Sequence, residues 1–123
     1  MTTATIISYA EIQPDISVRQ PDPEMRVKGA PQRTTRSYFV DPSFGLSSGI
    51  WSAETGAYKI SMATSKHEFF HILTGKVEIS CDGTGAVKSF GPGDTGIIPP
   101  GFTGMFEIVE SASKFYVVTD RNL

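Results

Sequence analysis

Short apolar runs separated by turn residues characterise the chain from about residue 49 onward. β-Branched and aromatic residues form these runs, and glycine, proline or aspartate interrupts them, as in chains of short strands joined by turns. The segment 76–81 alternates polar and apolar side chains like a half-buried strand, and Asp82-Gly83 supplies a turn after it. No segment shows a helical period. The expected strands are Gly49–Ser52, Ala57–Ala63, Glu68–Leu73, Lys76–Cys81, Ala86–Phe90, Thr95–Ile98, Gly104–Val109 and Lys114–Thr119.

The first 45 residues differ from the rest because prolines recur among polar and charged side chains. Proline lacks an amide donor and biases the residue before it toward extended geometry, so we expect no long regular element there. Ser37–Val40 is the best candidate for a short strand. The sequence therefore predicts an irregular N-terminal arm over residues 1–45, packed on a barrel over residues 46–123. The alternative is an arm that exchanges a strand with a second subunit.

Composition narrows the classes of partner. At 123 residues the chain suits a single domain, and a net charge of −2 with scattered Lys and Arg offers no basic face for nucleic acid. Cys81 is the single cysteine, so no intrachain disulfide can form. There is no signal-like start and no run approaching the roughly 18 apolar residues of a membrane span. We expect a soluble, cytoplasmic protein, neither exported nor anchored.

Two glycine-anchored stretches share a common frame. The first is Gly56, five residues, Met62-Ala63-Thr64, three residues, Glu68, six residues and Gly75; the second is Gly93, five residues, Pro99-Pro100-Gly101, two residues and Gly104. These spacings resemble the paired motifs of the cupin superfamily. Together with the short runs at 49–51, 73–77, 99–104 and 114–117, they resemble the branch that includes the cupin domain of ureidoglycine aminohydrolase and the ethanolamine-utilisation Q protein.

The resemblance implies an all-β fold, a single small jelly-roll barrel, and it also shows where this chain departs from the family. Metal-binding cupins carry histidines at the positions that Met62, Thr64 and Gly104 occupy here, so Glu68 alone keeps a coordinating group. One carboxylate does not define a transition-metal site, and we expect no cofactor. If a metal were held at all, Glu68 and His67 would hold it, after a strand bulge that turns His67 inward.

Glu68 is the candidate catalytic or anchoring residue. Burial penalises its charged form unless a cation or donor compensates, and Lys114, at the start of the last strand, is the candidate cation. The expected pocket-lining residues are Tyr58, Met62, Thr64, Phe70, Gly104 and Phe106. His67 and His71 have the opposite parity to Glu68 on an extended strand, so we expect them to face away from the interior.

The sequence thus predicts a cupin that binds a small polar metabolite in its barrel without a tightly held metal. Two alternatives stay open. The chain is an enzyme that uses Glu68, with Lys114 or Tyr58, on a ureide or an amine, or it is a non-catalytic structural or regulatory cupin. The resemblance and the open edges of short strands both favour a homodimer.

Overall fold

The computed structural model describes residues 3–122 and is built from strands. Three short 3-10 helices occur within this range, Tyr9–Glu11, Pro23–Met25 and Pro42–Phe44, and α-helix is absent from it. The strands are β1 (Asp15–Arg19), β2 (Arg26–Lys28), β3 (Arg33–Asp41), β4 (Leu46–Ala53), β5 (Gly56–Ser61), β6 (Lys66–Cys81), β7 (Val87–Phe90), β8 (Thr95–Ile98) and β9 (Thr103–Asp120). This is the all-β barrel that the sequence predicts.

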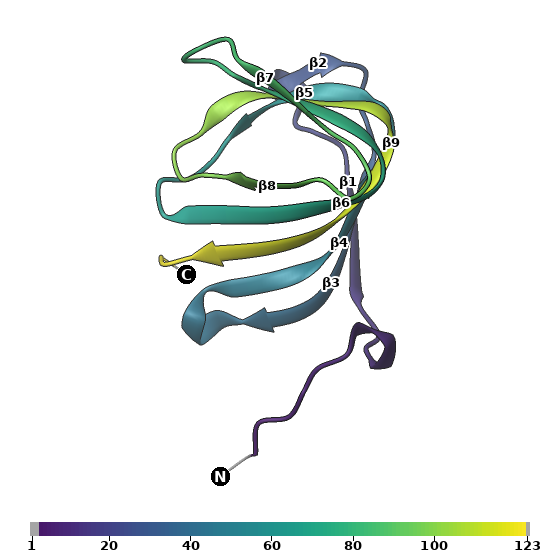
Figure 1. Cartoon of the computed structure of the whole chain (residues 1–123), viewed down its shortest axis with the longest axis vertical. Helices are drawn as coiled ribbons and strands as arrows, with labels where there is room; N and C mark the ends of the chain where they lie inside the picture. The colour runs from purple at the N-terminus through teal and green to yellow at the C-terminus, as the bar shows by residue number, and fades with distance from the viewer. Residues whose placement is uncertain (1–2, 123) are drawn as a thin grey trace.

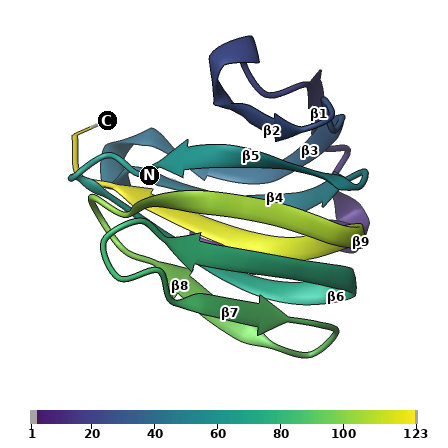
Figure 2. The same cartoon turned by 90° about the horizontal axis from the view of Figure 1, so that it is seen from above.

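The strands form two antiparallel layers that share β6 and β9 (Figure 1). In one layer the order is β1, β3, β4, the C-terminal half of β9, the N-terminal half of β6, and β8. In the other it is β2, β5, the N-terminal half of β9, the C-terminal half of β6, and β7. Figure 2 shows β1 to β3 toward one side of the barrel and β7 and β8 at the other.

The bend between the layers corrects one expectation. The segments 68–73 and 76–81 belong to a single strand, β6, and 104–109 and 114–119 belong to β9. The pairing between β6 and β9 shifts register between Ile72 and Val77, where Gly75 adopts a φ of 79°. A Cβ there would lie 2.1 Å from the carbonyl oxygen of Ser111, so glycine allows the two strands to bend together.

Alternation along the strands places one set of side chains between the layers. The buried cluster there consists of Ala53, Tyr58, Phe70, Ile72, Val77, Ile79, Ile98, Phe106, Ile108 and Ala112. Trp51, Ile60, Met62, Phe90 and Phe102 pack against it. The core is concentrated around the bend, so the opposite end of the barrel retains space between its layers.

The N-terminal segment is more regular than expected. The predicted irregular arm, residues 1–45, contains β1, β2 and the nine-residue strand β3, which extends well beyond Ser37–Val40. Long-range pairing explains why this segment is more regular than its sequence suggests, because β3 pairs with β4 on one side and with β1 on the other despite its polar composition. The described residues before Tyr9 extend away from the barrel (Figure 1). Tyr9 itself packs on the strands, because its ring stacks on Tyr38 of β3 with centroids 4.3 Å apart and its hydroxyl donates a hydrogen bond to Ser48 of β4.

Candidate functional site

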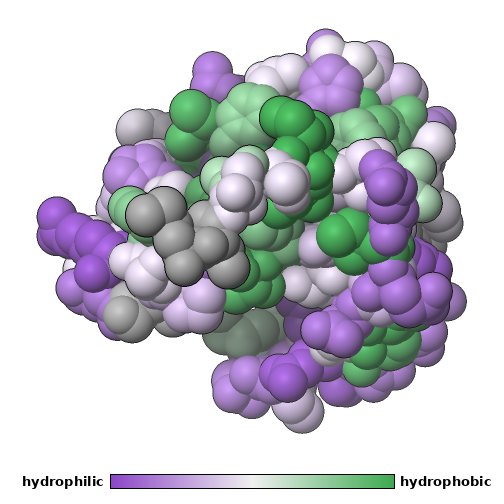
Figure 3. Space-filling model, turned by 90° about the horizontal axis from the view of Figure 1, so that it is seen from below, coloured by the Kyte–Doolittle hydropathy of each residue, from purple (hydrophilic) through white to green (hydrophobic). Residues whose placement is uncertain are grey.

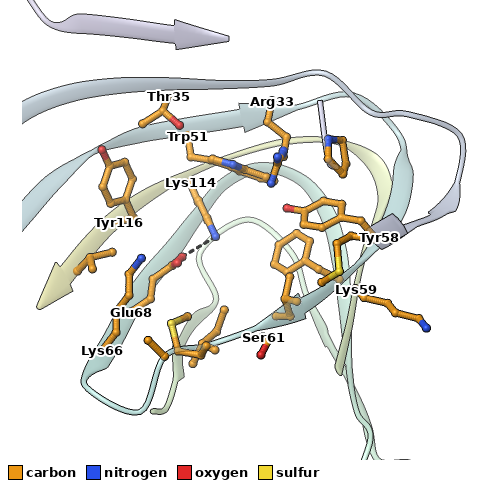
Figure 4. A pocket seen from close by; sticks show the side chains of 18 of the residues that line it. Arg33, Thr35, Trp51, Tyr58, Lys59, Ser61, Lys66, Glu68, Lys114 and Tyr116 are labelled. Atoms are coloured by element: carbon orange, nitrogen blue, oxygen red, sulfur yellow. Dashed lines mark hydrogen bonds and ion pairs between the residues drawn. The ribbon is translucent and has the colours of Figure 1, made fainter. Parts of the chain in front are cut away.

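A cavity of about 570 Å³ opens between the two layers, at the end of the barrel away from the bend (Figure 4). Strands β3, β4, β6 and β9 of the first layer form one side, and β5 with the N-terminal half of β9 forms the other. Residues 21–25 contribute to its rim. The lining combines aromatic rings with charged groups, which is the usual composition of a site for a small organic molecule.

Glu68 reaches the cavity because of its parity on β6. Phe70 and Ile72 share its face and are buried, whereas Phe69 is on the opposite face and is 41% exposed. The carboxylate of Glu68 accepts a hydrogen bond from Lys114, with 2.7 Å between Oε2 and Nζ. The side chains of Lys114 and Glu68 are 6% and 17% exposed. The compensating cation expected for Glu68 is therefore present in the cavity wall.

Aromatic rings surround the ammonium group of Lys114. Its Nζ lies 4.6 Å from the ring centroid of Trp51, 4.9 Å from that of Phe106 and 5.2 Å from that of Phe70. These distances fall within the range of cation–π attraction, which strengthens when water is excluded. The carboxylate and the rings together stabilise a charged lysine in a largely apolar wall.

A second cation, Arg33, enters the cavity from β3. Its guanidinium carbon lies 4.8 Å from the ring centroid of Tyr58, and its Nε is buried without a hydrogen-bond partner in the described part of the protein. Burial raises the pKa of the Tyr58 phenol, and the neighbouring positive charge of Arg33 opposes part of that rise. Burial likewise raises the pKa of Tyr116, whose side chain also lines the cavity.

Five of the eight catalytic and pocket-lining residues selected from the sequence line the cavity, and three do not. Tyr58, Met62, Glu68, Phe106 and Lys114 line the cavity. Thr64, Phe70 and Gly104 do not, and these three expectations are corrected.

Each correction has a local cause. Thr64 lies in the turn between β5 and β6, where strand alternation has ended, and its side chain is exposed. Phe70 faces the interior but lines a second, apolar cavity of about 200 Å³ with Ile79, Phe90 and Phe102. Its ring therefore belongs to the wall between the two cavities. Gly104 lies against the backbone of Ser80, which leaves no room for a side chain.

The positions that hold metal ligands in other cupins do not fit a metal here. A Cβ on Gly104 would lie 1.9 Å from the carbonyl oxygen of Ser80 and 2.8 Å from the Phe102 ring, so no side chain can extend from this position. His67 is exposed and borders a separate cavity near Asp120, which leaves Glu68 without the proposed partner. Residues 3–122 contain no group of three His, Cys, Asp or Glu side chains arranged to hold a metal ion.

His71 lies on the outer face, as its parity on β6 predicts. Its Nδ1 is 2.9 Å from Oγ1 of Thr95 on β8. Cys81 has a lowered pKa because the backbone of Gly83 and both the hydroxyl and the backbone of Thr84 hydrogen-bond to it.

Several lining residues were not selected as site candidates from the sequence. Those with charged or aromatic side chains include Arg33, Trp51, Lys66 and Tyr116. Lys66 has the same parity as Glu68 and points into the cavity beside it (Figure 4). Parity could have identified Lys66, whereas Arg33 had no usable signal because the strand that carries it was not expected to extend so far.

Comparison with known proteins places the chain in a family. The family model of the EutQ-like cupin domain matches residues 40–116, most of the barrel. The chain belongs to the EutQ-like cupin family. No curated protein matches it. The likeness to ureidoglycine aminohydrolase stays a prediction.

Solved structures support the same fold. A protein of unknown function of the DUF861 family from Pseudomonas syringae pv. tomato is 27% identical, with a TM-score of 0.71 over 88% of this chain and 44% of that one. EutQ from Clostridium difficile is 20% identical, with a TM-score of 0.63 over 73% of this chain and 64% of its own. A putative EutQ from Salmonella typhimurium is 15% identical, with a TM-score of 0.62 over 89% and 97% of the two chains.

This chain thus covers less than half of the Pseudomonas protein and just under two thirds of the Clostridium protein. The two EutQ structures support the fold alone. Among the described residues, no helix is long and apolar enough to cross a membrane.

Proposed function

We propose that this EutQ-like cupin binds a small polar organic molecule between its two layers, without a tightly held metal ion. The observation that carries the proposal is the Glu68–Lys114 pair in the wall of a cavity of about 570 Å³. Charged groups that are desolvated yet border open space can recognise a ligand directionally, and Trp51, Tyr58 and Phe106 supply the apolar contact area. The replaced histidine positions and the crowded backbone at Gly104 argue against a metal cage.

A thermal-shift screen of ureides, amines and small carboxylates tests this proposal. At least one class should raise the melting temperature of the wild type, and Glu68→Gln should reduce that rise when each protein is compared with its own ligand-free state. Glu78→Gln is the matched control, because Glu78 lies on the same strand but does not line the cavity. Absence of any shift would favour the structural or regulatory alternative.

Elemental analysis of the purified protein tests the metal part of the proposal separately. We expect transition metals well below one equivalent per chain, before and after incubation with manganese or zinc followed by desalting. One retained equivalent that is lost in Glu68→Gln would refute the proposal of a metal-independent site.

An acid–base enzyme acting on a ureide or amine is the second candidate function. The observation that favours it is the 2.7 Å separation of a carboxylate and an ammonium at the cavity surface, since such a pair can accept and return a proton. Any ligand from the screen should then be assayed for turnover. Glu68→Gln that retains binding but loses turnover would support catalysis, whereas unchanged turnover would refute a role for Glu68.

We also propose that the protein forms a homodimer in the cytoplasm. Phe69 and its register neighbour Ile97 are 41% and 63% exposed on the outer face of the first layer, and Phe115 on the same face is 40% exposed. Apolar side chains also gather on the face seen from below (Figure 3). Light scattering should give a dimer that Ile97→Lys weakens and Val87→Lys, on β7, leaves intact. A monomeric wild type at high concentration would refute the dimer.

A further inference from the structure

We infer that the molecule bound in the cavity is a small monoanion with a carboxylate group, and that Arg33 recognises this carboxylate. The inference rests on the proposed function and adds the chemical class of the ligand. It is drawn from the charges in the cavity and from the contacts that Arg33 makes and does not make.

The cavity wall has more positive than negative charge. Four lining residues are cationic (Arg33, Lys59, Lys66 and Lys114), and two are acidic (Asp22 and Glu68). Lys114 and Glu68 neutralise each other. Lys59 is exposed and points away from the cavity (Figure 4).

The remaining charges are Arg33 and Lys66 against Asp22 at the rim, which leaves one positive charge in excess. A cationic ligand would meet this excess, and the acid that remains for it is Asp22 at the rim, because Lys114 already pairs with Glu68 inside the cavity. A ligand with one negative charge matches the balance, whereas a phosphate dianion exceeds it.

Arg33 has the hydrogen-bonding capacity for such a ligand. The salt bridges among residues 3–122 are Lys114–Glu68 and Lys28–Glu107, so no carboxylate of the described chain pairs with Arg33. Its buried Nε also lacks a partner within that range. Buried donors on charged groups are costly to leave unpaired, and a guanidinium presents donors in a planar fork that fits the two oxygens of a carboxylate.

Tyr58 packs against the guanidinium group of Arg33. The Tyr58 ring centroid lies 4.8 Å from the guanidinium carbon, and the Tyr58 hydroxyl also interacts with Arg33 by a side-chain hydrogen bond, so Tyr58 holds the guanidinium at the cavity wall. Arg33 enters from β3, and Lys66 and Glu68 enter from β6 of the same layer, with β4 and β9 between these two strands (Figure 4). A carboxylate on Arg33 therefore leaves the rest of the ligand near Trp51 and the Glu68–Lys114 pair.

Two sets of size-matched probes in three charge states test the inference with the full chain. The sets are benzoate, benzamide and benzylammonium, and butanoate, butanamide and butylammonium. Binding is followed by calorimetry and by the indole N–H resonance of Trp51, the single tryptophan, which lines the cavity. In at least one set the carboxylate should bind about tenfold or more tightly than its amide, and the ammonium compound more weakly still.

Variants at Arg33 separate recognition from a structural role. In Arg33→Gln the preference for carboxylate over amide should fall toward one, and Arg33→Lys should retain part of it. Arg36→Gln on the same strand is the matched control, because Arg36 does not line the cavity, and it should keep the full preference. The ratio of the two affinities does not depend on overall stability, so it remains informative if a variant is less stable.

The outcomes distinguish the inference from the proposed function. Amides or ammonium compounds that bind as tightly as the carboxylates would overturn the inference and leave the proposed function standing. So would an unchanged preference in Arg33→Gln, or no binding by either carboxylate when other compounds in the larger screen bind. No binding by any compound in that screen would overturn both.

Discussion

The Glu68→Gln substitution removes one charge of the buried pair while keeping the shape of the side chain. Removing one partner of a buried ion pair costs about 3–5 kcal/mol in other proteins. Glu68 keeps 17% of its side-chain surface exposed, and the amide oxygen of glutamine can still accept a hydrogen bond from Lys114, so we expect a cost of about 2–3 kcal/mol. Lys114→Met should cost a similar amount and additionally lose about 1 kcal/mol of attraction to the three rings.

The double variant, Glu68→Gln with Lys114→Met, should lose less stability than the two single variants lose together, because it leaves neither charge buried without a partner. The expected coupling energy is about 2 kcal/mol. Urea denaturation of the four proteins measures it, and each kcal/mol also lowers the melting temperature by about 3–5 °C at this chain length. Lys28–Glu107 is the control pair, with a similar separation of 2.8 Å but a lysine side chain that is 63% exposed. Solvent should reduce its coupling far below that of the buried pair. Equal coupling in the two pairs, or strictly additive losses at Glu68 and Lys114, would refute this description of the cavity wall.

Three further predictions concern packing and titration. Gly49→Ala should destabilise the fold by about 1–3 kcal/mol in urea denaturation, because its Cβ would lie 2.1 Å from a carbonyl oxygen of β3. Gly91→Ala is the control, since no atom lies within 4 Å of its Cβ, and it should change stability by less than about 0.5 kcal/mol; equal effects would contradict the packing at Gly49. Since burial raises the pKa of Tyr58, the folded state keeps that proton to higher pH than the unfolded state, so stability should fall as pH rises above 10.0. Tyr58→Phe should lessen this fall and remove one of the late steps in tyrosinate absorbance, and an unchanged profile would place Tyr58 in solvent. A hydrogen bond from the Thr84 hydroxyl contributes to the lowered pKa of Cys81, so alkylation by iodoacetamide should begin at lower pH in the wild type than in Thr84→Ala. Identical pH profiles would show that the Thr84 hydroxyl has no influence on the thiol.

Strand alternation explains what could be predicted of the site. It placed Glu68 inside and His71 outside, because both lie on the regular part of β6, where successive side chains alternate between faces. The same rule failed for Thr64, which lies in a turn before the strand begins. Motif spacing failed for Gly104, because it contains no information that the backbone of Ser80 occupies the space a side chain would need.

The contribution of the N-terminal segment could not be derived from local pattern. Prolines and polar residues suggested irregular structure, yet pairing with β4 makes a strand of residues 33–41 and brings Arg33 into the cavity. The pattern of β6 and β9 had a related ambiguity, since two short strands and one bent strand give the same runs of residues. Long-range pairing decides both cases, and single-sequence periodicity contains no information about it.

The direct test of the account is a titration of the full chain with small carboxylates, followed through the indole N–H resonance of Trp51. We expect saturable shifts that are accompanied by changes in Tyr58 and Lys114 resonances and are weakened in Arg33→Gln. Shifts in these resonances produced by manganese or zinc at one equivalent, with none from any organic compound, would contradict the account.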